Sequence, residues 1–293
     1  MNFACMGVIN FTPNSFSDGN KLLNPSALND QLKFFKDNQV TVLDVGAESS
    51  APSNSAISFD LEKQRLSSFL KMAQLKPEDF PTISLDSYKS EVALWFFKEL
   101  SNIGFKSSQF IWNDISGVLD QSVLTFFDLF EQGRYVLCHN KAQNRELSTE
   151  HMNFVDENRP IFDEVRGFFE ERLKGFSSKQ SGAIILDPCF GFSKSFEQNL
   201  VLIDRFGELA SLFPEQSWVF GVSKKSFLRK LWQGHVENIL DKDSLLLKSE
   251  FIHQEILRRV MLECHQRSIL FRVHDPLIYK SSLFLTSHKL TKN

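Results

Sequence analysis

The sequence has few of the features that mark exported, disulfide-bonded or redox proteins. It contains four cysteines in 293 residues, at positions 5, 138, 189 and 264. No two of them have the C-x-x-C spacing, which argues against a zinc knuckle or a redox dithiol. Scattered thiols are typical of a reducing compartment, and residues 1–11 have neither a charged segment nor a long apolar run. We therefore expect no signal peptide and a cytoplasmic location.

Long apolar runs, basic clusters and glycine-rich phosphate loops are also missing. No stretch approaches the roughly 18 uncharged apolar residues of a membrane span. The formal net charge is −3 without a basic stripe, so we expect neither nucleic acid nor a membrane surface as a partner. No G-x-x-x-x-G-K-[ST] loop or dinucleotide fingerprint occurs, so phosphate binding by a glycine loop is not indicated.

Short apolar runs alternate with longer amphipathic stretches along the chain. The short runs predict eight buried parallel strands, at residues 5–11, 41–46, 82–86, 110–115, 134–139, 183–187, 217–222 and 268–274. The amphipathic stretches predict helices at residues 27–38, 58–75, 89–100, 121–132, 161–174, 196–212, 245–266 and 276–285. This alternation favours a (β/α)8 TIM barrel that forms a single domain over residues 1–293. An open, doubly wound sheet is the alternative.

Polar side chains stand at or just after the end of every predicted strand. They are Asn10, Asp44, Asp86, Asn113, His139, Asp187, Lys225, Arg272 and His274. In a parallel barrel these ends meet at one mouth, where catalytic pockets are built. The irregular segments 14–24, 49–57 and 141–159 follow strands at the same mouth, where loops carry function. For any single residue, capping of the next helix is the alternative explanation.

The strand-end groups fall into two sets by their chemistry. Carboxylate, amide and ammonium groups suit a flat nitrogenous ring with alternating donors and acceptors, and this set is Asp86, Asn113, Asp187 and Lys225. The second set suits an anion such as pyrophosphate, with help from Mg²⁺, and it is Asn10, Arg272 and His274.

Seven motifs resemble, in order, those of the dihydropteroate synthases. The first two are MGVINFTPNSFSDG at 6–19 and LDVGAES at 43–49; the others are SLDSYK at 84–89, WNDISG at 112–117, LDPCFGFSK at 186–194, GVSKKSF at 221–227 and FRVHD at 271–275. They span residues 6–275. The resemblance implies a (β/α)8 barrel that condenses 6-hydroxymethyl-7,8-dihydropterin pyrophosphate with p-aminobenzoate, giving 7,8-dihydropteroate and pyrophosphate in folate biosynthesis. It also implies a homodimer.

The resemblance assigns roles to individual residues. It places the pterin on Asp86, Asn113, Asp187 and Lys225. It places the pyrophosphate on Asn10, Arg272 and His274, with Mg²⁺ at Asn10, and p-aminobenzoate beside Ser50, Phe192, Lys225 and Ser226. The implied catalytic residues are Asp86, Lys225, Arg272 and His274. Pyrophosphate would leave before the amine attacks, without a covalent enzyme intermediate.

Several positions depart from the motifs of the family. Ala51 stands where the family usually has an arginine that helps to bind pyrophosphate. Cys189 and Ser193 replace two glycines of the motif at 186–194, and the fifth strand ends in Cys138-His139-Asn140, where a methionine is usual near the pterin. Two alternatives to the synthase therefore stay open: a pterin-binding paralogue without turnover, and a pterin-dependent methyltransferase with the same barrel.

Overall fold

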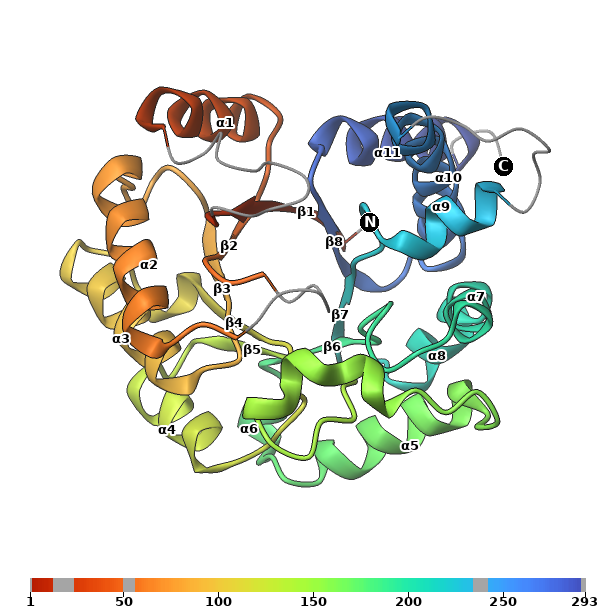
Figure 1. Ribbon diagram of the computed structural model, residues 1–293, viewed down its shortest axis with the longest axis horizontal. Helices are drawn as coiled ribbons and strands as arrows, with labels where there is room; N and C mark the ends of the chain where they lie inside the picture. The colour runs from red at the N-terminus through yellow and green to blue at the C-terminus, as the bar shows by residue number, and fades with distance from the viewer. Residues whose placement is uncertain (1, 13–23, 50–55, 234–241, 291–293) are drawn as a thin grey trace.

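Eight parallel strands close into a barrel in the computed structural model, which describes residues 2–12, 24–49, 56–233 and 242–290 (Figure 1). The strands are β1 (Asn2–Asn10), β2 (Val42–Gly46), β3 (Thr82–Asp86), β4 (Phe110–Asp114), β5 (Arg134–Cys138), β6 (Ile184–Asp187), β7 (Ser217–Phe220) and β8 (Ser268–Val273). Each pairs with the next, and β8 pairs with β1. The predicted TIM barrel is confirmed, and the open sheet is excluded because the β1–β8 pairing leaves no edge strand.

Helices surround the strands as an outer ring (Figure 1). They are α1 (Pro25–Asp37), α2 (Phe59–Ala73), α3 (Ser90–Asn102), α4 (Gln121–Leu129), α5 (Ile161–Leu173), α6 (Ser178–Ser181), α7 (Phe196–Asp204), α8 (Phe206–Leu212), α9 (Ser226–Gln233), α10 (Lys242–Glu263) and α11 (Pro276–Leu290). The described residues also form the 3-10 helices η2 (Ser107–Gln109) and η3 (Glu146–Phe154). None of the described helices has the length and apolarity to cross a membrane.

The helices differ from the prediction in several places, and the short α6 and η2 are among those not predicted. The helix predicted at 196–212 is divided because Arg205, at φ −105° and ψ 16°, leaves the helical range between α7 and α8. Helix α9 was not predicted, although Phe227 and Leu228 bury one side of it while Lys230 is exposed. Helix η3 also was not predicted, since its segment lacks a regular apolar period.

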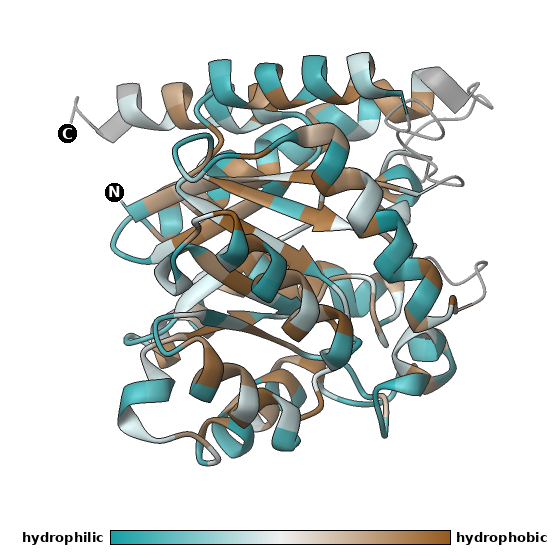
Figure 2. Ribbon diagram, turned by 90° about the vertical axis from the view of Figure 1, so that its left-hand side faces the viewer, coloured by the Kyte–Doolittle hydropathy of each residue, from teal (hydrophilic) through white to brown (hydrophobic). Residues whose placement is uncertain are grey.

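Phenylalanine builds much of the core between strands and helices. Phe97 of α3 stacks on Phe110 of β4 at 4.9 Å between ring centroids, and it also contacts Phe126 and Phe130 around α4. A separate apolar cluster inside the barrel includes Cys138. In the side view, apolar residues concentrate on the strands, whereas the helices alternate between polar and apolar faces (Figure 2). Burial of both strand faces explains why the strands are short continuous apolar runs.

Two exposed glutamines sit in left-handed backbone that favours glycine. Gln74 ends α2 at φ 46°, and Gln39 follows α1 at φ 59°. We expect Gln74→Gly and Gln39→Gly each to raise the free energy of unfolding by about 0.5–1 kcal/mol, because the left-handed conformation strains a residue with a Cβ. Gln64→Gly, at an exposed position inside α2, should lower it by about 1 kcal/mol. Urea unfolding measures all three, and a loss of stability in the first two would contradict the expectation.

Candidate active site

A cavity of about 870 Å³ opens at the carboxyl ends of the strands. The sequence-predicted residues that line it are Asn10, Asp86, Phe192, Lys225, Ser226, Arg272 and His274. Asn113 and Asp187 are not among its lining residues, because they are buried deeper, with 2 % and 8 % of their surface exposed. Ser50 and Ala51 lie outside the described residues. The structure therefore brings most of the predicted site together at one mouth of the barrel.

Arg272 holds two carboxylates together at the base of the cavity. Its Nε donates to Oδ2 of Asp44 at 2.7 Å, and its Nη2 donates to Oδ2 of Asp86 at 2.6 Å. Asp44 is fully buried and also accepts a weak hydrogen bond of 3.3 Å from Nδ2 of Asn113. The strand-end pattern included Asp44 but gave it no role. The structure shows that it orients Arg272, which remains beside the cavity for a ligand.

Burial shifts the protonation equilibria of this cluster. Burial raises the pKa of Asp86 to about 7, against the opposing effect of Arg272 and with a further rise from Asp44. Burial also raises the pKa of Asp187, although Lys225 and Arg272 act in the opposite direction. The pKa of Lys225 is lowered, again mainly by burial. Groups with such shifted equilibria, gathered in a cavity, are typical of catalytic and ligand-binding sites.

The second predicted set lies at the β1–β8 side of the cavity. Nδ2 of Asn10 is 3.4 Å from Nε2 of His274, whose Nδ1 is 3.0 Å from Oγ of Ser223. Burial, with Lys224 and Arg272 nearby, holds the pKa of His274 well below its usual value. His274 is therefore neutral at physiological pH, and the positive charge that meets an anion here comes from arginine and lysine.

An aromatic layer forms the opposite side of the cavity. The ring of His151, in η3, lies 4.0 Å from the ring of Phe192 at an interplanar angle of 32°. The Nζ of Lys225 is 4.5 Å from the centre of the same Phe192 ring. His151 lines the cavity but was missed from the sequence. The only signal was its place in the irregular segment 141–159, which identified a mouth loop but no particular residue.

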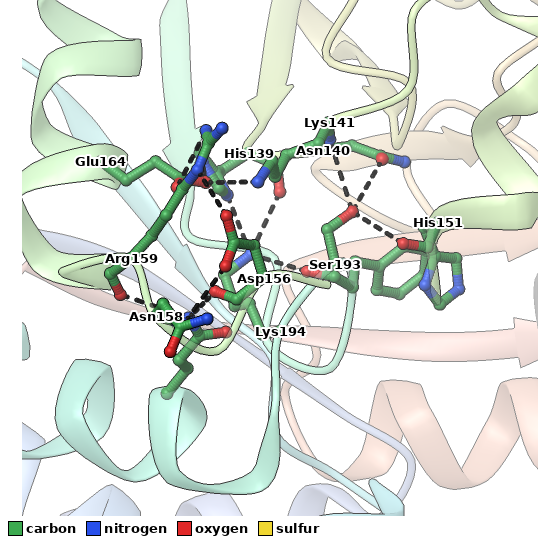
Figure 3. A network of polar contacts seen from close by, with 12 residues as sticks. His139, Asn140, Lys141, His151, Asp156, Asn158, Arg159, Glu164, Ser193 and Lys194 are labelled. Carbon is green, nitrogen blue, oxygen red and sulfur yellow. Dashed lines mark hydrogen bonds and ion pairs between the residues drawn. The ribbon is translucent and has the colours of Figure 1, made fainter. Parts of the chain in front are cut away.

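A buried lysine fixes the loop that carries Phe192 (Figure 3). Nζ of Lys194 donates to the carbonyl oxygens of Phe192, Cys189 and His139 at 2.9, 3.2 and 3.2 Å, and it is 2.9 Å from Nδ1 of His139. Burial lowers the pKa of Lys194 to about 8. Oγ of Ser193 donates to the carbonyl of His151 at 3.0 Å, which joins this loop to η3.

Two residues of the same loop that are not glycine have a glycine-like backbone. Cys189 has φ 56° and Ser193 has φ 51°, and these are the two positions where the family motif has glycine. The backbone is therefore in the left-handed region despite the substitutions, at a cost of about 1–2 kcal/mol for each residue. Hydrogen bonds from the buried Lys194 offset part of this cost.

One strand-end residue does not face the cavity. His139 packs edge-on against Phe168 at 4.9 Å, and its Nε2 is 3.6 Å from Glu164 of α5. Its place directly after β5, which ends at Cys138, turns it toward the helix layer. The expectation that all strand-end polar groups converge was therefore wrong for His139.

Comparisons with known proteins agree with this geometry. The family model described as "Pterin binding enzyme" matches residues 6–254. The chain is 31% identical over 228 residues to the "Folic acid synthesis protein fol1" of Pneumocystis carinii, with 76% of this chain but 29% of that protein covered. It is 28% identical to the "Dihydropteroate synthase" of Clostridium beijerinckii, covering 76% and 75% of the two chains.

The fold also matches solved structures. The Yersinia pestis dihydropteroate synthase with a sulfonamide drug complex superposes with a TM-score of 0.77 at 20% identity, covering 100% of this chain and 95% of that one. This likeness concerns the fold, whereas the family model covers most of the sequence together with the motifs at the strand ends. The chain thus belongs to the pterin-binding enzyme family.

Proposed function

We propose that this protein is a dihydropteroate synthase that joins 6-hydroxymethyl-7,8-dihydropterin pyrophosphate to p-aminobenzoate. The observation that carries the proposal is the cluster of Arg272, Asp86 and Lys225 at one cavity, between an anion-binding side and an aromatic side. The sequence likeness to proteins named dihydropteroate synthase supports it. The chain spans about 29% of the length of the two fol1 relatives, so their other activities are not included.

The pterin is proposed to bind at the base of the cavity. Carboxylates of Asp86 and Asp187 accept hydrogen bonds from its amino and ring N–H groups, while Asn113 and Lys225 donate to its acceptors. Asp86 also stabilises the positive charge that develops on the pterin methylene carbon as its bond to oxygen breaks.

The bonding electron pair leaves with pyrophosphate, at the side of Arg272 and His274. Arg272 neutralises developing negative charge on the leaving oxygen, and the neutral imidazole of His274 donates a hydrogen bond. Mg²⁺, when bound, supplies further charge neutralisation. Asn10 is its proposed protein ligand, and the nearby buried Oγ1 of Thr12, which makes no hydrogen bond to the described residues, is a further polar group for it or its waters.

The amine of p-aminobenzoate then attacks the carbon, loses a proton, and forms the new C–N bond. Its ring fits against Phe192, beside Nζ of Lys225. Its carboxylate is proposed to face Ser226, the first residue of α9, because helix amino termini favour anions. Ser50 lies outside the described residues, and its place beside p-aminobenzoate stays a prediction.

Product analysis tests the function directly. Purified protein with both substrates and Mg²⁺ should release pyrophosphate and form 7,8-dihydropteroate in equal amounts, as measured by mass spectrometry and a coupled pyrophosphate assay. Asp86→Asn is the matched negative control. Tight pterin binding without any product would instead support the non-catalytic paralogue. Binding of methyltetrahydrofolate without p-aminobenzoate affinity would support the methyltransferase.

The pKa of Asp86 predicts a rise of activity with pH. With a pKa of about 7, the ionised fraction that accepts the pterin N–H bonds increases about tenfold between pH 6 and 8. We expect kcat/KM for the pterin substrate to increase by that factor in wild type and to lose this dependence in Asp86→Asn. The pKa of His274 is held well below its usual value, so titration of His274 does not cause this rise in kcat/KM.

The stability contribution of Asp86 has the opposite pH dependence. Its folded-state pKa lies above the value of 3.8 for an unperturbed aspartate, so its contribution is complete below about pH 4 and is lost as the pH rises through 7. Urea midpoints across this range, compared between wild type and Asp86→Asn, separate this effect from the catalytic one. A wild-type kcat/KM that stays flat from pH 6 to 8 would exclude the proposed role of its carboxylate.

The proposed assembly is a homodimer through α10 and α11, in a cytoplasmic protein. Large apolar side chains on these helices are exposed, among them Phe251 at 61 % and Phe284 at 62 %. Such side chains together indicate an interface more often than a free surface. The cytoplasmic location rests on the four cysteines, which are free and buried. Light scattering of wild type and of Phe251→Glu tests the dimer.

A further inference from the structure

Two cysteines that are far apart in sequence meet at the carboxyl ends of β5 and β6. Cys138 ends β5, and its backbone pairs in register with Asp187, which ends β6. Cys189 follows two residues later, in the left-handed backbone at φ 56°. This conformation places both thiols and the Asp187 carboxylate in one buried group. The absence of a C-x-x-C motif had argued against such a cluster, but spacing along the chain does not report contacts between neighbouring strands.

The distances in this group suit a metal ion. The two Sγ atoms and a carboxylate oxygen of Asp187 all lie within 4.8 Å of one another, and Sγ of Cys138 is 3.8 Å from Oδ2 of Asp187. A tetrahedral zinc ion, with bonds of about 2.3 Å to sulfur and 2.1 Å to oxygen, separates such ligand atoms by roughly 3.6–3.8 Å. Only small side-chain movements are needed to close the ligands around an ion.

The carboxylate is already oriented for this role. Oδ1 of Asp187 accepts a hydrogen bond of 2.6 Å from the backbone N–H of Cys189. This bond fixes the carboxylate and leaves Oδ2 directed toward Cys138. Metal ligands in proteins are usually held in this way by hydrogen bonds from surrounding groups.

The surrounding charges also suit a metal with these ligands. Two thiolates, one carboxylate and a divalent cation carry a net charge of −1, and the thiol protons are released on binding. The ammonium groups of Lys225 and Lys194 act on Asp187 from nearby and would offset that charge. Without metal, the neighbouring Cys189 thiol and burial raise the pKa of Cys138 well above its usual value, so it is not a reactive thiolate.

We propose that Cys138, Cys189 and Asp187 form a binding site for a thiophilic divalent cation such as Zn²⁺, with water as the fourth ligand. Because Asp187 is also a proposed pterin ligand, the cation and the pterin exclude one another. The exclusion rests on the proposed function, whereas the metal site does not. A cation that prefers thiolate ligands would thus inhibit the protein. It differs from Mg²⁺, which prefers oxygen ligands.

Cobalt titration tests the metal site without any substrate. Protein reduced with a phosphine and desalted should bind one equivalent of Co²⁺ with a thiolate-to-metal charge-transfer absorption. Cys138→Ala and Cys189→Gly should each lose at least half of that absorption, whereas Cys5→Ala and Cys264→Ala, at buried cysteines elsewhere, should keep it. Cys189→Gly suits the backbone conformation, so its folding, checked by thermal melting, is expected to be preserved. No absorption in wild type, or full absorption in Cys189→Gly, overturns the site.

Competition binding tests the exclusion. With free Zn²⁺ at 100 times its own dissociation constant, the apparent Kd for the pterin should rise about 100-fold in wild type and stay unchanged in Cys189→Gly. A wild-type pterin affinity that does not respond to bound Zn²⁺ overturns the exclusion. Failure of the metal-free protein to bind any pterin would overturn the proposed function instead, and the cobalt titration would still decide the metal site.

Discussion

Arg272→Gln should lower kcat/KM by about 100- to 1,000-fold, because it removes the cation that meets the leaving pyrophosphate. It should also lower the free energy of unfolding by about 3–5 kcal/mol, because it leaves the buried carboxylates of Asp44 and Asp86 without their shared partner. Steady-state kinetics with the pterin substrate and urea unfolding measure the two effects separately.

A second substitution separates stability from catalysis. Adding Asp44→Asn to Arg272→Gln removes one unpaired charge, so stability should recover in part while activity stays lost. Arg259→Gln, which breaks an ion pair with Asp204 at the protein surface, should change stability by less than about 1 kcal/mol. Near-normal turnover by folded Arg272→Gln would contradict both the proposed mechanism and the assignment of the anion-binding side.

The barrel could be predicted because its constraint is local and repeated. Each strand is buried on both faces and must be a short apolar run, as at Val42–Gly46 and Ile184–Asp187, and each connection must be long enough for a helix. The end of a strand also identifies the mouth of the barrel. For this reason Asn10, Asp86 and Arg272 could be placed at one cavity from the sequence alone.

Contacts between side chains of different strands could not be predicted in this way. The strand-end pattern does not show that Arg272 binds Asp44, that His139 turns outward to Glu164, or that Cys138 meets Cys189. These contacts depend on strand register and on backbone turns of one or two residues after each strand. The role of His151 depends on an irregular segment, which has no periodicity from which its direction could be inferred.

Arg145 is the residue that fixes this irregular segment, and its replacement by methionine should have a large effect. Its guanidinium pairs with the fully buried Asp114 and with Asp120, and it donates to the carbonyl oxygens of Tyr88 and Val118. Removing it leaves the Asp114 charge buried and unpaired, so we expect a loss of about 3–5 kcal/mol in the free energy of unfolding. Urea unfolding measures this loss.

The same substitution should change one substrate site more than the other. Arg145 directly precedes η3, which places His151 against Phe192 on the aromatic side of the cavity. We therefore expect KM for p-aminobenzoate to rise several-fold in folded Arg145→Met, while the Kd for the pterin, bound at the base of the barrel, changes little. Asp120→Asn is the matched control, because it removes the more exposed of the two carboxylate partners and should cost about 1 kcal/mol or less. An equal loss of affinity for both substrates in Arg145→Met would show that the segment supports the whole barrel mouth rather than its aromatic side alone.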